Sequence, residues 1–521
     1  MRREVVRTGL LLLAVAAAGC ASLAPPVASV PTRALSDVAQ TPLARIAAAG
    51  ASEQAPGASG FRLLPEASFA FDARIALVRK AERSLDVQYY LIQNDDVGLQ
   101  LLRELRDAAA RGVRVRLLVD DFYTAGEDEL LATLAAFPNV EVRLFNPLPW
   151  RAGSLEMRVL FSLNEFSRIN HRMHNKLLVA DNSFAVSGGR NIANDYFMRS
   201  TSANFIDVDI LSSGPIVPRM SEGFDRYWNS AQVRPVGGVV QGAPKGEAAQ
   251  RRFDHLAARA APDVPVRERD VLGRTPLTAQ LAEGVVERDW GHAELFVDDP
   301  AKITRAADEA IRGSVTEGAL TALNSARAGV LIVSPYFIPN ERGLAMMQTA
   351  VAHGGHIKIV TNSLGSTDEP LAYAGYARSR AAMLRAGIEL RELGAGLASC
   401  SGRFGDFGQS ISRMHAKLAV IDDKRLFIGS MNLDRRSAVV NTEAALLIDS
   451  PTLVARFLSL SSGDRFNAAY RLRLNPATGA VEWLEDGADG QDVVHTDEPG
   501  GQYGTRLKNW LLLPIVGTDL L

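Results

Sequence analysis

The sequence has very little cysteine. Only Cys20 and Cys400 occur among its 521 residues. If Cys20 carries a lipid, no intramolecular disulfide can form, and we interpret Cys400 as incidental. The HExxH, CxxC and P-loop patterns, which build zinc, redox and nucleotide sites, are also absent.

The chain has no excess of charge of either sign. Its 57 Lys and Arg residues nearly balance 59 Asp and Glu residues, for a formal net charge of -2. A general nucleic-acid binder needs a basic surface that displaces phosphate counterions. The charge balance therefore argues against nucleic acid as a partner, although it leaves room for a local basic pocket.

Long apolar runs are also missing after residue 20, so no later segment is expected to span a bilayer. Before that point Arg2, Arg3 and Arg7 precede a short apolar stretch that ends in Ala-Ala-Gly-Cys. This pattern is similar to a bacterial lipoprotein signal, and it predicts that residues 1–20 form a signal peptide with lipidation at Cys20. The alternative is an ordinary signal peptide with an incidental cysteine.

Lipidation would make the mature protein an exported lipoprotein that faces the periplasm, on an inner or outer membrane that the sequence does not identify. Residues 21–60 are rich in Ala, Pro and Ser, which predicts a flexible tether. Near the other end, residues 510–516 (WLLLPIV) fit either an interfacial membrane anchor or a segment packed on the core.

One extended pattern, His-x-Lys-x4-Asp-x6-Gly-(Gly/Ser)-x-Asn, occurs twice, and every member of the second copy lies 241 residues after its counterpart. Such a match in register is not an accident of composition. It indicates an internal duplication, in which two histidines can meet at an interface and divide one reaction. The first copy consists of His174, Lys176, Asp181, Gly188, Gly189 and Asn191, and the second of His415, Lys417, Asp422, Gly429, Ser430 and Asn432.

Strand-like and helix-like segments alternate around both copies, as in α/β proteins. We predict two pseudo-twofold-related domains at residues 61–235 and 289–521, joined by a connector at 236–288. Each is expected to have a mixed, mostly parallel sheet flanked by helices, with the site at the domain interface. The predicted strands cover residues 84–91, 113–120, 140–145 and 207–211, then 330–337, 356–362, 388–393 and 442–449, and the predicted helices 98–111, 128–137 and 217–231, then 315–326, 343–353, 370–385 and 453–466.

The residue types of the motif suit chemistry at a phosphate group. We expect each HxK segment to lie in a strand, so that its histidine and lysine face the same side. A histidine is a nucleophile or acid near neutral pH, and a lysine is a fixed cation that binds phosphate oxygens. Two facing half-sites would let one imidazole attack phosphorus while the other protonates the leaving alcohol, with no metal or other cofactor required.

The remaining motif positions are assigned supporting roles. Gly189, Ser430, Asn191 and Asn432 are predicted to bind the substrate phosphate, the first two by letting the backbone approach closely and the asparagines through their amides. The two aspartates lie seven residues after their histidines, so we expect Asp181 and Asp422 to hold the following turn rather than to contact substrate. Carboxylates that orient the imidazoles are expected at Asp207, for which Asp209 on the same face is an alternative, and at Glu443.

On these residues the chain resembles the phospholipase D superfamily, whose hallmark is the paired HxKx4D motif, and especially the bacterial cardiolipin synthases. Segments such as LDVQYYLIQND (85–95) and MHAKLAVIDDKRLFIGSMNLDRRSAVVNTE (414–443) carry the likeness, which extends over residues 61–521. The resemblance implies a catalytic set that includes Asp181 and Asp422, and a covalent phosphohistidine. It also implies that His174 is the nucleophile and His415 the general acid and then base.

The resemblance further implies transfer of a phosphatidyl group from phosphatidylglycerol or phosphatidylethanolamine to another phosphatidylglycerol, at a membrane surface. A phospholipase D hydrolase, with water as acceptor, is the first alternative, since the acceptor depends on pocket shape and water exclusion. A nucleic-acid phosphodiesterase and a catalytically inactive lipid-binding lipoprotein are less favoured. The sequence does not indicate the oligomeric state.

Overall fold

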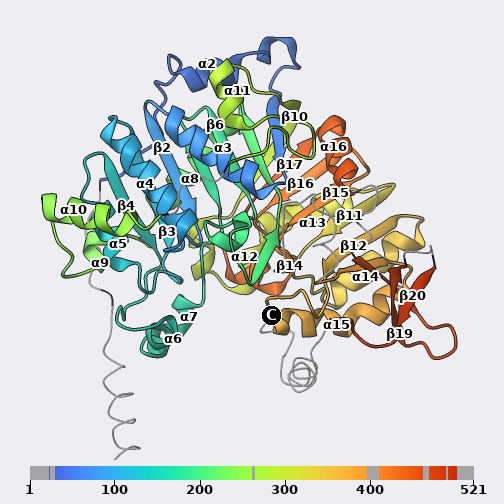
Figure 1. Ribbon diagram of the computed structural model, residues 1–521. Helices are drawn as coiled ribbons and strands as arrows, with labels where there is room; N and C mark the ends of the chain where they lie inside the picture. The colour runs from blue at the N-terminus through green and yellow to red at the C-terminus, as the bar shows by residue number, and fades with distance from the viewer. Residues whose placement is uncertain are drawn as a thin grey trace, which may run out of the picture.

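The computed structural model describes residue 23 and residues 30–260, 265–395, 410–461, 469–487 and 491–500. The predictions for the signal peptide, Cys20, Cys400 and the run at 510–516 lie outside these residues. Figure 1 shows an α/β molecule with two halves, one coloured blue to green and the other yellow to red. Within the described ranges, no helix combines the length and the apolar character needed to cross a membrane.

The first half is built on three parallel strands connected by helices. β2 (Ser84–Tyr89), β3 (Arg114–Asp120) and β4 (Val140–Phe145) lie side by side, with α4 (Asp96–Ala110) and α5 (Asp128–Leu134) in the crossovers. Antiparallel strands then continue the sheet from β2. Its other elements are β1 (Ser59–Leu64), α3 (Ala67–Lys80), β5 (Leu177–Ala180), β6 (Phe184–Gly188), η3 (Asn194–Phe197), β7 (Ala203–Ile206), β8 (Asp209–Ser213), α8 (Ile216–Trp228) and β9 (Val233–Pro235).

The second half repeats this plan. β11 (Gly329–Val333), β12 (His356–Asn362) and β13 (Glu389–Leu393) are parallel, with α14 (Glu341–Ala352) and α15 (Pro370–Arg385) between them. The remaining elements are β10 (Asp289–Val297), η4 (Pro300–Thr304), α12 (Ala307–Ile311), α13 (Val315–Asn324), β14 (Ile411–Met414), β15 (Leu418–Ile421), β16 (Arg425–Gly429), η6 (Arg436–Val440), β17 (Ala444–Asp449), α16 (Pro451–Ser461), β18 (Ala469–Leu474), β19 (Val481–Asp486) and β20 (Asp492–His495).

The prediction of α/β architecture with mixed sheets is confirmed, but the expectation of mostly parallel pairing is wrong. Among the described strands of the main sheet, only β2–β3–β4 and β11–β12–β13 pair in parallel, and the other pairings are antiparallel. The reason is local. In each half the motif hairpin, β5–β6 or β15–β16, has a short connection that makes its strands antiparallel, and the next strand of the sheet, β8 or β17, also runs antiparallel.

The two halves share one continuous sheet and one core. β1 pairs with β8 of its own half and with β10, and β10 pairs in turn with β17. Helices α8 and α16 contribute apolar side chains such as Phe224 and Phe457 to a central core, which also contains Met173 and Met414, one residue before each motif histidine. The motif strands are therefore anchored in apolar packing that belongs to both halves.

Residues 30–60, the part of the predicted tether that the structure describes as a continuous stretch, pack on the first half. α2 (Pro42–Ala48) buries Leu43 and Ile46, and Trp228 Nε1 donates to Thr32 Oγ1 at 2.9 Å. Apolar residues within the Ala-rich stretch account for this packing. In the predicted connector, α9 (Val236–Val239), α10 (Gly246–Ala257) and α11 (Leu277–Glu283) pack on the first half.

Candidate active site

The two motif histidines lie at the junction of the halves, just before strands β5 and β15. Neither HxK segment is itself a strand, contrary to the prediction, because each backbone leaves its own sheet to bond with the other half. The His174 N–H donates to the Thr442 carbonyl at 2.9 Å, and the His415 N–H donates to the Ile206 carbonyl at 2.8 Å. In the same way, β14 pairs in parallel with β7 of the first half.

Each imidazole is held by a buried carboxylate from the opposite half. His174 Nδ1 donates to Glu443 Oε2 at 2.9 Å, and His415 Nδ1 donates to Asp207 Oδ2 at 2.7 Å. Both carboxylates are fully buried. A histidine whose Nδ1 carries the proton for such a bond presents the lone pair of its other nitrogen, Nε2, to a reactant. Asp209 instead pairs with Arg74 at 2.8 Å, so it takes no part in holding an imidazole.

The two half-sites differ at Gly189 and Ser430, and the structure shows why. A Cβ atom at Gly189 would lie 2.4 Å from Asp207 Oδ1, so this position must be glycine to admit the carboxylate. In the other half, the hydroxyl of Ser430 donates to Glu443 Oε2 at 2.5 Å. Both residues thus lie against the histidine-bound carboxylates, and their binding of phosphate stays a prediction.

The two motif lysines lie beside the imidazoles and are almost fully buried. Lys176 Nζ donates to the His174 carbonyl at 2.6 Å, and Lys417 Nζ donates to the His415 carbonyl at 2.5 Å. Each ammonium group has three N–H donors, so one bond to a carbonyl leaves capacity for an anion.

Burial dominates the proton affinities of these groups. Desolvation lowers the pKa of Lys176 to about 7 and that of Lys417 to about 8. It also lowers the pKa of His174 to about 4, against the opposing effect of Glu443. The pKa of His415 lies well below its ordinary value because of burial and the charges of Lys417, Lys176 and His174. Both imidazoles are therefore neutral in the free protein at neutral pH.

The two carboxylates differ in electrostatic character. Burial would raise the pKa of Glu443, but His174 and Lys176 hold it below its ordinary value. For Asp207 burial prevails over the charges of Lys417 and Arg190, and the pKa is raised. His174 thus has the more firmly ionised partner, which favours a basic Nε2.

The motif asparagines have unused hydrogen-bonding capacity. Asn191 Nδ2 donates to Tyr196 Oη at 2.9 Å. The Oδ1 atoms of Asn191 and Asn432 are both buried without a partner among the described residues. Because a buried amide oxygen without a partner is costly, its occurrence at equivalent positions of both halves fits a ligand-binding role.

Asp181 and Asp422 lie away from the imidazoles and hold a turn, although not the turn that follows the motif. Asp181 accepts from the N–H groups of residues 82–84 at 2.8 to 3.0 Å, directly before and at the start of β2. Asp422 accepts from those of residues 327–329, before and at the start of β11. The aspartate of each motif therefore connects the motif hairpin to the start of the adjacent strand, β2 in the first half and β11 in the second.

Two acidic pairs, Asp120–Asp121 at the end of β3 and Asp298–Asp299 after β10, lie near the site. No sequence pattern indicated that their first members hold the segments that carry His174 and Glu443. Asp120 accepts from Arg172 Nε at 2.9 Å and from the Met173 N–H at 2.8 Å. Asp298 accepts from Lys302 Nζ at 2.7 Å and from the Glu443 N–H at 2.9 Å. Among the described residues, no group of three or more His, Cys, Asp or Glu side chains is arranged to hold a metal ion.

Aromatic rings flank both imidazoles. The Tyr90 ring lies 5.1 Å from that of His174, and the Tyr196 and Phe205 rings lie 5.0 and 5.1 Å from that of His415. No sequence motif marks these three aromatic residues as part of the site. Their rings limit access of water and thereby strengthen the electrostatic interactions of the site.

Comparison with known proteins agrees with this geometry. The family model described as "Cardiolipin synthase, PLD-like domain" matches residues 75–228 and 319–461. Cardiolipin synthase C of Escherichia coli (strain K12) is 37% identical over 457 residues, which cover 87% of this chain and 94% of that protein. Cardiolipin synthase 2 of Staphylococcus epidermidis is 26% identical over 381 residues, 73% of this chain and 62% of that protein.

Among solved structures, a phosphatidylserine synthase of Haemophilus influenzae superposes with a TM-score of 0.56 at 15% identity, and the match covers 90% of this chain and 95% of that one. At this identity the likeness shows the fold. The fold is therefore that of paired α/β units, and in this chain two histidines lie at their junction. The chain belongs to the phospholipase D superfamily and is an enzyme homologous to the cardiolipin synthases.

Proposed function

We propose that this enzyme transfers a phosphatidyl group from phosphatidylglycerol or phosphatidylethanolamine to the headgroup hydroxyl of phosphatidylglycerol, which yields cardiolipin. The carrying observation is the pair of neutral imidazoles, each held through Nδ1 by a carboxylate of the other half and flanked by a buried lysine. The similarity to cardiolipin synthases over most of the chain supports the choice of lipid substrates.

In the proposed first step, His174 Nε2 attacks the phosphorus atom of the donor lipid. A phosphorus–nitrogen bond forms, the bond to the headgroup oxygen breaks, and His415 gives that oxygen a proton. The free enzyme holds His415 neutral, largely through burial and the nearby lysines. An anionic phosphodiester between Lys176 and Lys417 offsets these positive charges, so substrate binding favours the protonated imidazole.

In the proposed second step, His415 takes a proton from the hydroxyl of the acceptor lipid, whose oxygen attacks phosphorus and releases His174. The ammonium groups of Lys176 and Lys417, and the Nδ2–H groups of Asn191 and Asn432, stabilise the charge on the other phosphate oxygens. Glu443 keeps His174 in the nucleophilic tautomer throughout. In this scheme the acceptor decides the product, because water in place of the lipid hydroxyl would give phosphatidic acid.

A lipid assay tests the proposal. Full-length enzyme is incubated with phosphatidylglycerol vesicles, with and without phosphatidylethanolamine, and the products are identified by mass spectrometry beside a His174→Ala control. We expect cardiolipin only with the intact histidine, and the dependence on added phosphatidylethanolamine identifies the donor. Phosphatidic acid without cardiolipin would replace the transferase with a hydrolase, and no turnover of either lipid would direct the search to other phosphodiesters.

We also propose that the protein is an exported lipoprotein with its lipid on Cys20. The basic, apolar and small-residue order of residues 1–20 supports this location. Metabolic labelling with a fatty-acid analogue should mark the parent chain and not a Cys20→Ser variant. Equal labelling of both chains, or of neither, would overturn the anchor.

A further inference from the structure

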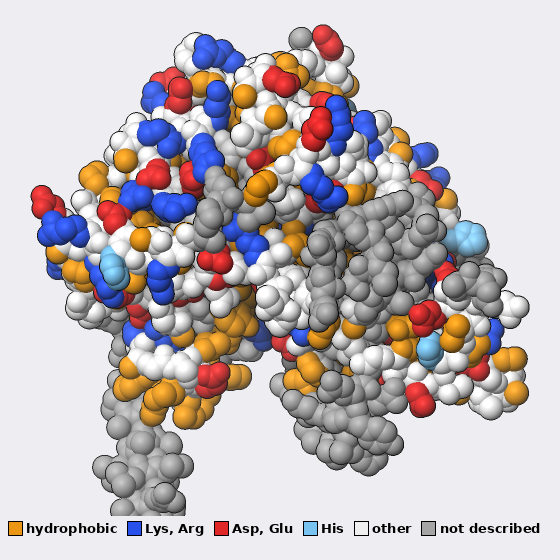
Figure 2. Space-filling model, viewed as in Figure 1, with side chains coloured by type: hydrophobic (Ala, Val, Ile, Leu, Met, Phe, Trp, Pro, Cys, Tyr) orange, Lys and Arg blue, Asp and Glu red, His pale blue; other side chains and the backbone are white. Residues whose placement is uncertain are grey.

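A short helical segment close to the active site exposes apolar side chains. α6 (Leu155–Leu160), η2 (Leu163–Glu165) and α7 (Phe166–Ile169) follow one another between β4 and β5. Four side chains of this segment, here called the apolar patch, are about half exposed: Met157 45%, Leu160 54%, Leu163 49% and Phe166 53%. Hydrophobic side chains gather at the lower left of Figure 2, where Figure 1 places α6 and α7.

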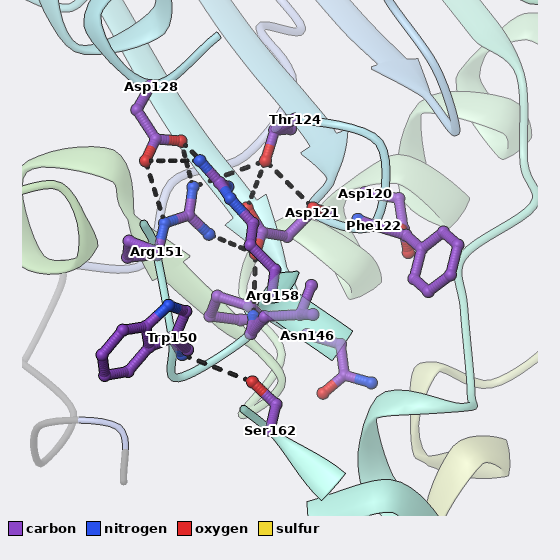
Figure 3. Close-up of polar contacts among 12 residues, drawn as sticks. Asp120, Asp121, Phe122, Thr124, Asp128, Asn146, Trp150, Arg151, Arg158 and Ser162 are labelled. Carbon is purple, nitrogen blue, oxygen red and sulfur yellow. Dashed lines mark hydrogen bonds and ion pairs between the residues drawn. The ribbon is translucent and has the colours of Figure 1, made fainter. Parts of the chain in front are cut away.

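The arginines at the base of this segment are directed into the molecule. Arg158 is buried and pairs with Asp128 at 3.0 Å. Arg151 pairs with both Asp121 and Asp128, as Figure 3 shows. An ordinary surface helix directs its apolar side chains inward and its charges toward water. Here Arg158 is buried while four large apolar side chains face outward, although Glu156 on the same helix is also exposed. This arrangement fits an apolar environment at the patch.

Two neighbouring carboxylates at the end of β3 hold both the chain that leads into the patch and the chain that leads to His174. Asp120 bonds Arg172 and the Met173 N–H, next to His174. The adjacent Asp121 bonds the Leu148 N–H at 2.7 Å and Arg151. Because two consecutive carboxylates fix both features, the patch has a set position relative to the nucleophile.

An aromatic series also connects this turn with the site. Tyr123, 41% exposed, packs its ring 5.4 Å from that of Tyr90, which in turn lies 5.1 Å from the ring of His174. A series of rings therefore leads from the turn that holds Arg151 to the imidazole of His174. A lipid that enters along it would keep its acyl chains against apolar groups while its phosphate reaches the lysines.

We propose that the apolar patch inserts into the surface of the phospholipid bilayer that holds the substrate, and so sets the site at the depth of the headgroup phosphates. This inference rests on the proposed phospholipid substrate. A second copy of the chain is a poorer occupant, because a stable protein interface takes about 20–30 residues a side and the patch is one short segment. Bilayer insertion needs only a few apolar side chains when a second membrane signal is present.

Site-specific fluorescence tests the insertion directly. In a full-length chain with Cys400→Ser, which keeps Cys20 and its proposed lipid as the second membrane signal, an environment-sensitive dye is attached at Leu160→Cys, or at Val493→Cys as a control. Both labelled chains keep Cys20, so any dye on that residue contributes equally to the two. Val493 is 49% exposed on β20 of the other half, so the two positions start with similar exposure. The vesicles contain phosphatidylglycerol and phosphatidylethanolamine. A fraction of the phosphatidylethanolamine carries a quencher on its acyl chain.

We expect quenching at position 160 to exceed that at position 493 several-fold and to persist at high salt, because apolar insertion is not screened. Equal quenching at the two positions would overturn the proposal. So would a blue shift at position 160 without vesicles: if it grows with protein concentration it identifies a second copy, and if it does not it identifies a segment of the same chain.

A kinetic comparison separates this inference from the proposed function. A chain with Met157→Ser, Leu160→Ser, Leu163→Ser and Phe166→Ser should lose at least about tenfold in turnover on vesicles. It should retain the parent rate on monomeric short-chain phosphatidylglycerol, which also shows that it folds. Unchanged turnover on vesicles would refute the patch and leave the function intact, whereas quenching at position 160 without cardiolipin formation by the parent would refute the function alone.

Discussion

At the scale of single residues, the division of labour between the histidines depends on two buried carboxylates that come from opposite halves. Glu443 holds His174 and Asp207 holds His415, and these contacts join residues 269 and 208 positions apart. The geometry assigns the tautomer of each imidazole. The electrostatic difference between the carboxylates favours His174 as the nucleophile.

A Glu443→Gln substitution should slow formation of the covalent intermediate by about 10²- to 10⁴-fold, because the imidazole loses both its fixed tautomer and the negative charge beside it. Rapid-quench measurement of the adduct with labelled phosphatidylglycerol would show the effect. Asp207→Asn is the matched control, and it should chiefly slow the release of the intermediate to the acceptor. An unchanged rate of adduct formation in the Glu443→Gln chain would contradict the assigned role.

Gly189 and Ser430 offer a second matched pair. Gly189→Ala would place a methyl group 2.4 Å from the Asp207 carboxylate, so we expect displacement of that carboxylate and a loss of activity of about 10²-fold or more. Ser430→Ala removes one hydrogen bond to Glu443 and creates no clash, so its loss should be about tenfold. Steady-state turnover of both variants checks the order, and a Gly189→Ala chain as active as Ser430→Ala would be inconsistent with the steric account.

The lysines predict a dependence on pH. Burial lowers their pKa values to about 7 and 8, so the free site loses positive charge as the pH rises through that range, and kcat/KM for an anionic lipid should fall. In the same range the unfolded chain binds more protons than the folded chain, so the free energy of unfolding should rise with pH. Activity and urea-denaturation profiles should therefore run in opposite directions, and a flat kcat/KM across this range would be evidence against neutralisation of the lysines.

The acid side has the same origin. His174 has a pKa of about 4 in the folded protein, below its ordinary 6.5. The unfolded chain therefore takes up this proton first, and the stability contributed by the neutral buried imidazole falls as the pH drops from about 6.5 toward 4. A His174→Ala chain should show a shallower loss of stability over this interval.

At the scale of elements, the motif aspartates connect each motif hairpin to the adjacent strand, β2 or β11, through hydrogen bonds to backbone N–H groups. Asp181 is fully buried and accepts three backbone N–H groups, so Asp181→Ala should lower the free energy of unfolding by about 2–4 kcal/mol. Asp422→Ala, at a more exposed position, should cost less. Urea denaturation measures both, and a larger cost for Asp422→Ala would contradict this role.

The elements also show what the sequence was able to predict. β12 and α15 were predicted with their observed bounds, because alternating apolar residues and helical spacing are local properties. The strand assignment of the HxK segments failed because their hydrogen-bond partners lie in the other half, more than 200 residues away. The antiparallel majority was missed for a related reason, since strand direction depends on connections and not on composition.

For the candidate site, the residue types and the duplication identified the histidines and lysines, and the carboxylates at Asp207 and Glu443 were predicted from matched strands. Which carboxylate serves which histidine was not predictable, because the exchange between halves is a tertiary feature. The steric need for Gly189 and the rings of Tyr90 and Tyr196 depend likewise on packing that a single sequence does not specify.

At the scale of the whole molecule, the halves form one catalytic unit. A continuous sheet runs through β1 and β10, and the central core contains residues of both halves. Each half also supplies the carboxylate that holds the other half's histidine. Duplication therefore produced an enzyme in which neither copy has a complete site of its own. We propose that this arrangement makes His174 the residue that carries the phosphatidyl group.

Trapping of the covalent intermediate tests that claim most directly. Full-length enzyme is mixed with labelled phosphatidylglycerol, denatured within the first turnover under conditions that preserve phosphoramidates, and its peptides are examined by mass spectrometry. We expect a phosphatidyl adduct on the peptide that contains His174, and no such adduct in a His174→Ala chain. An adduct on His415, or cardiolipin formation with no adduct on either histidine, would contradict it.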